Sequence, residues 1–239
     1  ALSEIHFPPD QERLQIARYR LVYQELLLLQ LGLGLRRGIR AAVSTAPLLE
    51  TTAKIDARIR RLFPFELTEG QDVAIKEITA DLSRSHPMNR LLQGDVGSGK
   101  TVIALYATLL AVAHGYQVAI MAPTEVLARQ HARVLGGFLA KSRVRTALLT
   151  GSMSKGQREL VVTEISQGTI DVVIGTHALV QPGVNFSRLG LVIIDEQHKF
   201  GVRQRAELKD EGPHYLVMTA TPIPRTLTMT LFGDLDVST

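Results

Sequence analysis

The stretch RLLQGDVGSGKTVIALYATLL, residues 90–110, decides the fold of this chain. It begins with a short strand-like run, Arg90–Gln93, continues through the glycine-rich GDVGSGKT at 94–101, and enters a helical run that extends to about His114. The middle part fits the pattern G-x-x-x-x-G-K-[ST], which indicates a phosphate-binding loop when it lies between a strand and a helix. The order of strand, glycine loop and helix therefore predicts a loop that binds the phosphates of a nucleotide, rather than an ordinary glycine turn.

Each residue type in this loop has a physical reason to be there. Glycine lets backbone N–H groups approach phosphate oxygens because no Cβ intervenes, and the N-terminus of the following helix adds a favourable dipole. We expect the Lys100 ammonium to lie between the β- and γ-phosphates and the Thr101 hydroxyl to bind Mg²⁺. The residues expected around the phosphates are Gly94, Asp95, Val96, Gly97, Ser98, Gly99, Lys100 and Thr101.

A second strand-like run, LVIIDE at 191–196, ends in two acids. The carboxyl ends of parallel strands lie at one edge of a sheet, so these acids can face the glycine loop. Asp195 is predicted to hold Mg²⁺ and Glu196 to polarise the attacking water, so that both would be catalytic together with the loop lysine. Gln197 and His198 follow directly and are candidates for sensing the γ-phosphate. The alternatives are a solvated acidic loop and, for the histidine, a structural hydrogen bond.

Short apolar runs alternate with helical stretches from Phe65 onward. Such runs suit strands that are buried on both faces of a parallel sheet, and their alternation with helices is typical of an α/β domain with helices on both faces. We therefore predict an α/β P-loop NTPase domain over about 65–239, with helices at Thr124–Lys141 and Ser154–Gln167. The expected strands are Arg90–Gln93, Val118–Ala122, Thr146–Leu149, Ile170–Ile174, Leu189–Ile194 and Tyr215–Thr219.

Residues 1–64 have a different pattern and are predicted to form a helical extension. Pro8 and Pro9 suit the opening of a helix, where a missing N–H costs nothing, and three glycines are expected to end that helix. A second amphipathic helix is expected after Pro47, and its arginines are interpreted either as a solvated face or as a DNA-contacting surface. The glycines are Gly32, Gly34 and Gly38, the apolar stripe of the second helix is Leu48, Ile55, Ile59 and Leu62, and the arginines are Arg58, Arg60 and Arg61.

The composition excludes several classes of site. The chain has no cysteine, so disulfide partners, thiolate zinc sites and cysteine nucleophiles are excluded. A formal net charge of +4 and a pI of about 9.5 suit either a polyanionic partner or a solvated, slightly basic surface. The most apolar stretch, Leu21–Leu35, is too short and too polar to span a bilayer, and no signal peptide is seen, which predicts a cytoplasmic protein with no membrane partner. The first and last residues suggest a piece of a longer protein.

Further strings between residues 65 and 239 resemble, in order and spacing, the motifs of superfamily 2 helicases. In that superfamily the amide of the glutamine motif reads adenine, because an amide can donate and accept hydrogen bonds at once. The strings are FELTEGQ at 65–71 for the glutamine motif, APTE at 122–125 for motif Ia, TG at 150–151 for motif Ic, GTH at 175–177 for motif Ib, and TATP at 219–222 for motif III.

Two longer strings narrow the resemblance to one family. DEQHKFGV at 195–202 and TATPIPRTL at 219–227 are similar to the RecG-type helicases, which act on branched DNA. The form of the glycine loop agrees, and the opening ALSEIHFP at 1–8 resembles the segment that leaves the wedge domain in that family. The resemblance therefore covers essentially the whole chain.

This resemblance implies a RecA-like domain that binds ATP and Mg²⁺, with Gln71 selecting adenine. The chain would be the first motor domain of an ATP-dependent DNA helicase that remodels stalled forks and Holliday junctions in recombination and repair. Its partners would be branched or duplex DNA, a wedge domain, and a second RecA-like domain that supplies an arginine finger, so the isolated chain is expected to be nearly inactive. The residues expected to contact DNA are Thr124, Thr150, Gly151, Thr176 and His177, and those expected to couple hydrolysis to movement are Thr219, Thr221 and Arg225.

Three other interpretations stay open. A transcription-repair coupling translocase is a near relative, but there Asp-Glu-Glu-Gln would be expected where this chain has DEQH at 195–198. An RNA helicase of the same superfamily is disfavoured by that string and by the Ile-Pro-Arg that follows motif III. A binding assay in which duplex DNA and duplex RNA compete would distinguish it from a DNA helicase. The third interpretation is a binding module that depends on a nucleotide but drives no movement of DNA. ATP turnover measured with and without the second motor domain would distinguish it from an enzyme.

Overall fold

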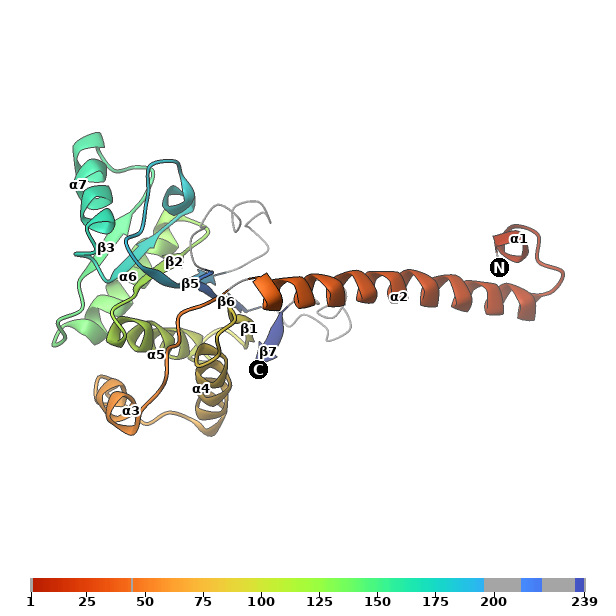
Figure 1. The fold of residues 1–239 in the computed structure, drawn as a ribbon, viewed down its shortest axis with the longest axis horizontal. Coiled ribbons are helices and arrows are strands. Elements are labelled where there is room, and N and C mark those ends of the chain that lie inside the picture. The colour runs from red at the N-terminus through yellow and green to blue at the C-terminus, as the bar shows by residue number, and fades with distance from the viewer. Residues whose placement is uncertain (1, 44, 196–211, 221–234, 239) are drawn as a thin grey trace. The chain divides into compact units, whose positions relative to one another are not determined.

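A computed structural model describes residues 2–43, 45–195, 212–220 and 235–238 of the chain. The chain divides into two compact units (Figure 1). Of the described residues, the first unit comprises 2–43 with Leu235, and the second comprises 45–195, 212–220 and 236–238. Among the described residues, no helix is long and apolar enough to cross a membrane.

The second unit is built on a seven-stranded sheet in the order β3-β4-β2-β5-β6-β1-β7, and each neighbouring pair is parallel. The interior strands β2 and β4 are buried along their whole length, as expected for a parallel sheet covered by other elements. The first six strands confirm the runs predicted from the sequence, within one or two residues at each end. The strands are β1 Asn89–Gln93, β2 Gln117–Met121, β3 Thr146–Leu149, β4 Val172–Gly175, β5 Leu189–Asp195, β6 His214–Thr219 and β7 Asp236–Ser238.

Four helices of this unit, α3, α4, α6 and α7, begin at hydroxyl-bearing residues that cap them. The side chains of Thr52, Thr68, Thr124 and Ser154 each accept a hydrogen bond from the amide three residues later, which satisfies one of the free N–H groups of the first turn. The predicted α/β fold is confirmed, and the helix after the glycine loop runs almost as expected. The helices are α3 Ala53–Arg60, α4 Glu69–Leu82, α5 Lys100–Ala113, α6 Glu125–Leu139, α7 Lys155–Ser166 and the 3₁₀ helix η1 His177–Val180.

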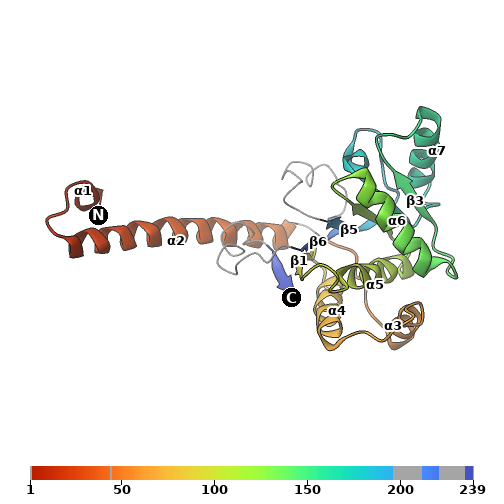
Figure 2. The same ribbon diagram turned by 180° about the vertical axis from the view of Figure 1, so that it is seen from behind.

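The core of this unit centres on α5, which is buried from Val102 to Ala111. It packs on β2 and β5 of the sheet and is covered by α3 and α4, and Figures 1 and 2 show these three helices side by side from both sides. Burial of so many apolar side chains, at about 25 cal/mol per Å², is the main term that stabilises the unit. The rigid position of α5 fixes the loop at its N-terminus.

The segment before α3 is fixed along the unit by hydrogen bonds of its backbone. The Ala46 N–H donates to the Ser85 carbonyl at 2.8 Å, and the Leu49 N–H donates to the Leu82 carbonyl at 2.9 Å. The Leu49 side chain is fully buried. This segment therefore belongs to the second unit, together with α3, which the sequence had assigned to the extension. The identity of residues 1–64 as a linker stays a prediction.

The first unit contains α1 Leu2–His6 and α2 Gln11–Val43. The prediction that glycines end the long helix is wrong, because α2 continues through Gly32, Gly34 and Gly38. A glycine inside a helix costs about 1 kcal/mol relative to alanine, which the surrounding leucine, arginine and alanine residues offset. A glycine ends a helix when it adopts a left-handed conformation, and these three do not. The start also differs, since the Asp10 carboxylate caps the helix by accepting from the Arg13 N–H at 2.8 Å.

Candidate functional site

The glycine-rich loop joins the end of β1 to the start of α5, at the carboxyl edge of the parallel sheet (Figure 1). Gly97 and Gly99 have φ values of +84° and +87°, in the left-handed region that residues with a Cβ rarely adopt. The Gly94 N–H donates to the Thr219 carbonyl at 3.3 Å, which joins the loop to the end of β6. Residues 95–98 are exposed. The strand, loop and helix predicted from the sequence are thus present, and the loop faces solvent.

The Lys100 side chain turns back over this loop. Its Nζ donates to the carbonyls of Gly94 and Asp95, each at 2.7 Å. An ammonium group has three N–H donors and no acceptor, so one donor and the full positive charge remain for another ligand. The arrangement places a cation beside the exposed backbone of the loop, where it suits a phosphate.

Gln71 is brought to the same loop by the first turn of α4. Its Oε1 accepts from the Thr68 N–H at 3.0 Å, and its Nε2 donates to the Ser98 carbonyl at 3.0 Å. The contact is close, because a Cβ at Gly99 would lie 2.2 Å from the Gln71 Nε2 atom. A glutamine amide has a second N–H and further lone pairs, so an adenine edge can still be bound. That role stays a prediction, whereas the link between α4 and the loop was not expected from the sequence.

An ionic cluster fixes α3 and α4 against α5. Arg60 is paired with Asp56, at 2.9 Å from its Nε, and with Asp72, at 2.8 Å from its Nη1, while the Tyr106 hydroxyl donates to Asp56 at 2.6 Å. Burial alone would raise the pKa of Asp56, but the hydrogen bonds from Tyr106 and Arg60 outweigh it and lower that pKa. Burial, and then the Asp56 carboxylate, raise the pKa of Tyr106. Arg60 is therefore a structural residue, and the spacing of Asp56 and Arg60 is the signal that could have indicated it.

Asp195 ends β5 at the same edge of the sheet. Its Oδ2 lies 2.8 Å from Nε2 of His131, which belongs to α6, and the two side chains are 16% and 13% exposed. A carboxylate and an imidazole so close and so little exposed form a specific hydrogen bond, and the sequence motifs did not point to this histidine. The candidates Glu196, Gln197, His198, Thr221 and Arg225 lie outside the described residues.

The loops predicted to contact DNA follow β2, β3 and β4 at this edge, and much of their polar chemistry is used within the protein. The Thr124 hydroxyl caps α6 by accepting from the Leu127 N–H at 3.3 Å. Thr150 is fully buried, and Thr176 is 3% exposed with a hydroxyl that has no partner within the described part of the chain. His177 begins η1 and is exposed. The Thr124 hydroxyl is thus engaged within the protein and Thr150 and Thr176 are buried, so DNA contact by these loops stays a prediction.

One pair of residues joins two of these loops. The Glu125 carboxylate, at the start of α6, accepts from the Ser152 N–H at 3.0 Å and from the Ser152 hydroxyl. The hydrogen bond from this hydroxyl is the main cause that lowers the pKa of Glu125, and the Arg129 guanidinium adds to it. The loop after β3 is thereby tied to the N-terminus of α6.

The oxygen donors at this edge fit Mg²⁺ bound together with a nucleotide. Magnesium prefers hard oxygen ligands and is usually held by one or two carboxylates together with substrate phosphates. Asp195 supplies a carboxylate and Thr101 a hydroxyl, and the described residues contain no cluster of three or more His, Asp or Glu side chains that would hold a metal alone. The donor set therefore suits a metal that arrives with a triphosphate.

Comparison with known proteins identifies relatives along the whole chain. The family model "DEAD/DEAH box helicase" matches residues 68–230. The ATP-dependent DNA helicase RecG of Synechocystis sp. is 49% identical over 240 residues, which cover 100% of this chain and 29% of that protein. RecG of Bacillus subtilis is 47% identical over 248 residues, covering 100% of this chain and 35% of that protein. The chain thus spans about a third of the length of these relatives.

Solved structures agree with the sequence comparison. The structure of RecG bound to a three-way DNA junction has a TM-score of 0.86 and 44% identity, and covers 98% of this chain and 32% of that chain. The helicase MrfA bound to DNA has a TM-score of 0.59 at 19% identity, which shows similarity of fold alone. The family model, the RecG relatives and the solved RecG structure lead to one assignment. The chain belongs to the DEAD/DEAH box helicase family, and within it resembles the RecG helicases.

Proposed function

We propose that this chain is the ATP-binding half of a RecG-type motor that moves on branched DNA. The observation that carries the proposal is the loop at residues 94–101, which joins β1 to α5 with left-handed backbone at Gly97 and Gly99 and shares the carboxyl edge of the sheet with Asp195. The similarity of the whole chain to RecG helicases, one of which is solved with a three-way DNA junction, supports the choice of substrate.

In this proposal the residues of the loop bind ATP, and water cleaves it to ADP and phosphate. Lys100 offsets the charge on the β- and γ-phosphates, Thr101 and Asp195 hold Mg²⁺, and Gln71 selects adenine. Bound Mg²⁺ neutralises charge on the phosphate oxygens. Glu196 takes a proton from the attacking water, which makes the water a better nucleophile.

The loops after β2, β3 and β4 would contact the DNA backbone, with Gly151 and His177 exposed for this purpose. Contacts made by backbone N–H groups to phosphates do not read bases, so binding is expected to be independent of sequence and sensitive to salt. Thr219 lies at the end of β6 and accepts from the Gly94 N–H through its carbonyl. This contact would let motif III respond to the state of the nucleotide loop.

A motor of this type needs a second RecA-like domain, which supplies an arginine worth about 10³–10⁵ in rate. Because the chain spans about a third of its relatives, we propose that this arginine and the DNA wedge lie in other parts of the parent protein. The isolated chain should therefore bind ATP weakly, hydrolyse it very slowly and fail to unwind forks.

The test is a steady-state ATPase assay of the 239-residue chain and of a longer protein that includes the second domain, each with and without a synthetic three-way junction. We expect little DNA stimulation of the chain alone and strong stimulation of the longer protein. Turnover of the chain alone at about 1 s⁻¹ or more, the range of an ordinary enzyme, would contradict the need for a second domain. Absence of turnover in both would favour a binding module over an enzyme.

A further inference from the structure

His131 belongs to none of the motifs from which the nucleotide site was predicted, yet it contacts the metal-ligand candidate of that site. Its Nε2 lies 2.8 Å from the Asp195 Oδ2, and the two residues are 64 positions apart in the sequence. Their side chains are only 13% and 16% exposed. A contact of this kind is made by the packing of α6 against the sheet, rather than by two flexible side chains meeting at the surface.

The chemistry of the contact restrains Asp195. An ionised carboxylate only accepts hydrogen bonds, so the histidine must donate from Nε2. The donated hydrogen bond fixes Oδ2 and does not occupy Oδ1, which can then bind a metal. Groups that hold the ligands of a metal in this way set their orientation, and changing them typically costs about 10–100-fold in metal affinity or activity.

The helix that carries His131 also has a second attachment. At its N-terminus, Glu125 is bonded to Ser152 in the loop after β3. Glu125 and His131 are six residues apart, which corresponds to about 9 Å along a helix axis. A single rigid helix therefore reaches from Asp195 to one of the loops proposed to contact DNA.

We propose that His131 is a positioning residue, which orients Asp195 for the metal-bound nucleotide and connects it through α6 to the loop at 150–152. This inference rests on the proposed function, because it assumes that Asp195 binds Mg²⁺ together with ATP. The histidine acts through Asp195 and does not touch the nucleotide.

The experiment compares variants at position 131 with a matched control. His131→Leu and His131→Phe remove the donor, whereas His131→Gln keeps an N–H near the position of Nε2. His114→Leu is the control, because it removes a histidine that also contacts an oxygen, the Glu50 carbonyl at 2.9 Å, at the far end of α5. Thermal melting of each variant reports whether the fold is kept, and the two apolar variants serve as alternatives if one of them unfolds.

The measurement is equilibrium binding of a fluorescent ATP analogue as MgCl₂ is increased, and again in EDTA. His131→Leu and His131→Phe should raise the Mg²⁺ concentration for half-maximal binding by about tenfold or more, with unchanged affinity in EDTA. The Mg²⁺ concentration for half-maximal binding should be close to the wild-type value in His131→Gln and equal to it in His114→Leu.

Two results would overturn the inference and identify which assumption failed. If the wild type shows metal-dependent binding and the apolar variants match it, or lose as much affinity in EDTA as with Mg²⁺, His131 is only a packing residue and the proposed function stands. If the wild type binds the analogue without any dependence on Mg²⁺, the assignment of Asp195 fails and the proposed metal-dependent site fails with it.

Discussion

Two groups of loops share the carboxyl edge of the sheet, and they differ in how much of their polar chemistry is already used within the protein. The glycine-rich loop proposed to bind the nucleotide exposes residues 95–98, and the contacts of the Lys100 ammonium within the described part of the chain are to carbonyls of that loop. In the loops after β2 and β3, Thr124 caps a helix and Glu125 is bonded to Ser152. The first group thus exposes residues 95–98 while Lys100 stays bonded within the loop, whereas the second group is bonded between its loops.

This difference has a physical consequence for how each group responds to its ligand. A loop whose donors face solvent can bind an anion without losing protein contacts. Loops that bond one another must either use their remaining backbone groups or exchange an internal hydrogen bond for one to the ligand, at a net cost of about 1 kcal/mol for each bond lost. Substitutions in the nucleotide loop should therefore have larger effects than substitutions in the second group.

The largest effect is expected for Lys100→Ala. Removal of a charged group that faces the transferred phosphate should lower ATP turnover of the two-domain protein by about 100-fold or more. The fold should be kept, because the Lys100 Nζ contacts two loop carbonyls and no other group of the residues that the structure describes. The control is Lys155→Ala, whose side chain is 92% exposed in a 4.0 Å ion pair with Glu159. Equal turnover in the two variants would refute the assignment of the nucleotide loop.

A smaller effect is expected for Gln71→Ala, measured as the ratio of ATP to GTP affinity. An unmet hydrogen-bond pair costs about 1–3 kcal/mol, so the preference for ATP should fall by about 5-fold to 150-fold. Thr68→Ala is a suitable control, because it removes the hydroxyl that caps α4 but keeps the N–H that binds Gln71. It should lower the melting temperature and keep the preference. A wild type that binds GTP as well as ATP would show that Gln71 serves the loop alone.

A still smaller effect is expected for a substitution that tests whether α6 connects the two groups of loops. Glu125→Ala releases α6 from Ser152 and should raise the Mg²⁺ requirement of nucleotide binding by about threefold, in the range of coupling energies between sites. In the background of His131→Leu the same substitution should have no further effect, because the contact to Asp195 is already lost. Additive effects in the double variant would mean that α6 does not connect the loops.

The parts of the site that the sequence predicted are those made by neighbouring residues. GDVGSGKT at 94–101 contains the glycines, the lysine and the helix start in one string, so its geometry follows from local chemistry. The sheet was predicted because each buried strand is a continuous apolar run. The contacts of His131, Glu125 and Gln71 were not predicted, since their partners lie 64, 27 and 27 residues away. Such pairs depend on how helices pack on the sheet.

The errors in the first unit have a local cause. Glycine was interpreted as a helix end, but its effect depends on whether the backbone turns left-handed, and the sequence of α2 gives no sign of that choice. In the second unit, the short strand β7, Asp236–Ser238, was missed, because three residues carry no recognisable periodicity.

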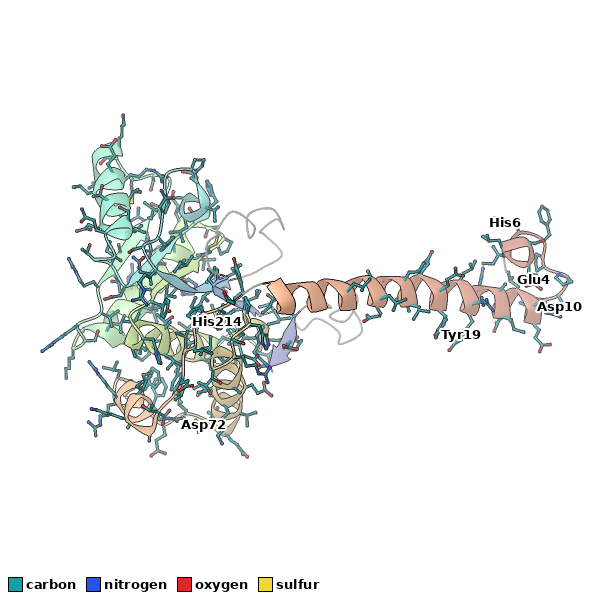
Figure 3. The ribbon with its side chains drawn as sticks, in the orientation of Figure 1. Glu4, His6, Asp10, Tyr19, Asp72 and His214 are labelled. Atoms are coloured by element: carbon teal, nitrogen blue, oxygen red, sulfur yellow. The ribbon has the colours of Figure 1, made fainter. Side chains whose placement is uncertain are left out.

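The smallest effect is expected at the opposite edge of the sheet, at His214 (Figure 3). The Met88 N–H donates to its Nδ1 at 2.9 Å, so the ring is neutral and its Nε2 donates to the Pro47 carbonyl at 2.8 Å. Burial lowers the pKa of His214 from its ordinary value of 6.5, the nearby His86 adds to this, and the Pro47 carbonyl and Asp81 oppose it. The native chain therefore binds fewer protons here than the unfolded chain.

Stability contributed by neutral His214 is complete above the unfolded pKa and is lost as the pH falls below about 6.5. His214→Gln, which cannot take up a proton, should be less stable than the wild type near neutral pH, because an amide fits the two hydrogen bonds less well. Its free energy of unfolding in urea should however fall less between about pH 7.5 and 5.5 than that of the wild type. His6→Gln, which replaces an exposed histidine of the first unit, is the control and should keep the wild-type pH dependence.

Because His214 contacts neither group of loops, nucleotide affinity at neutral pH should be unchanged in His214→Gln. A change in nucleotide affinity would mean that β6 transmits the state of its amino end to Thr219, and the two edges of the sheet would then not be independent.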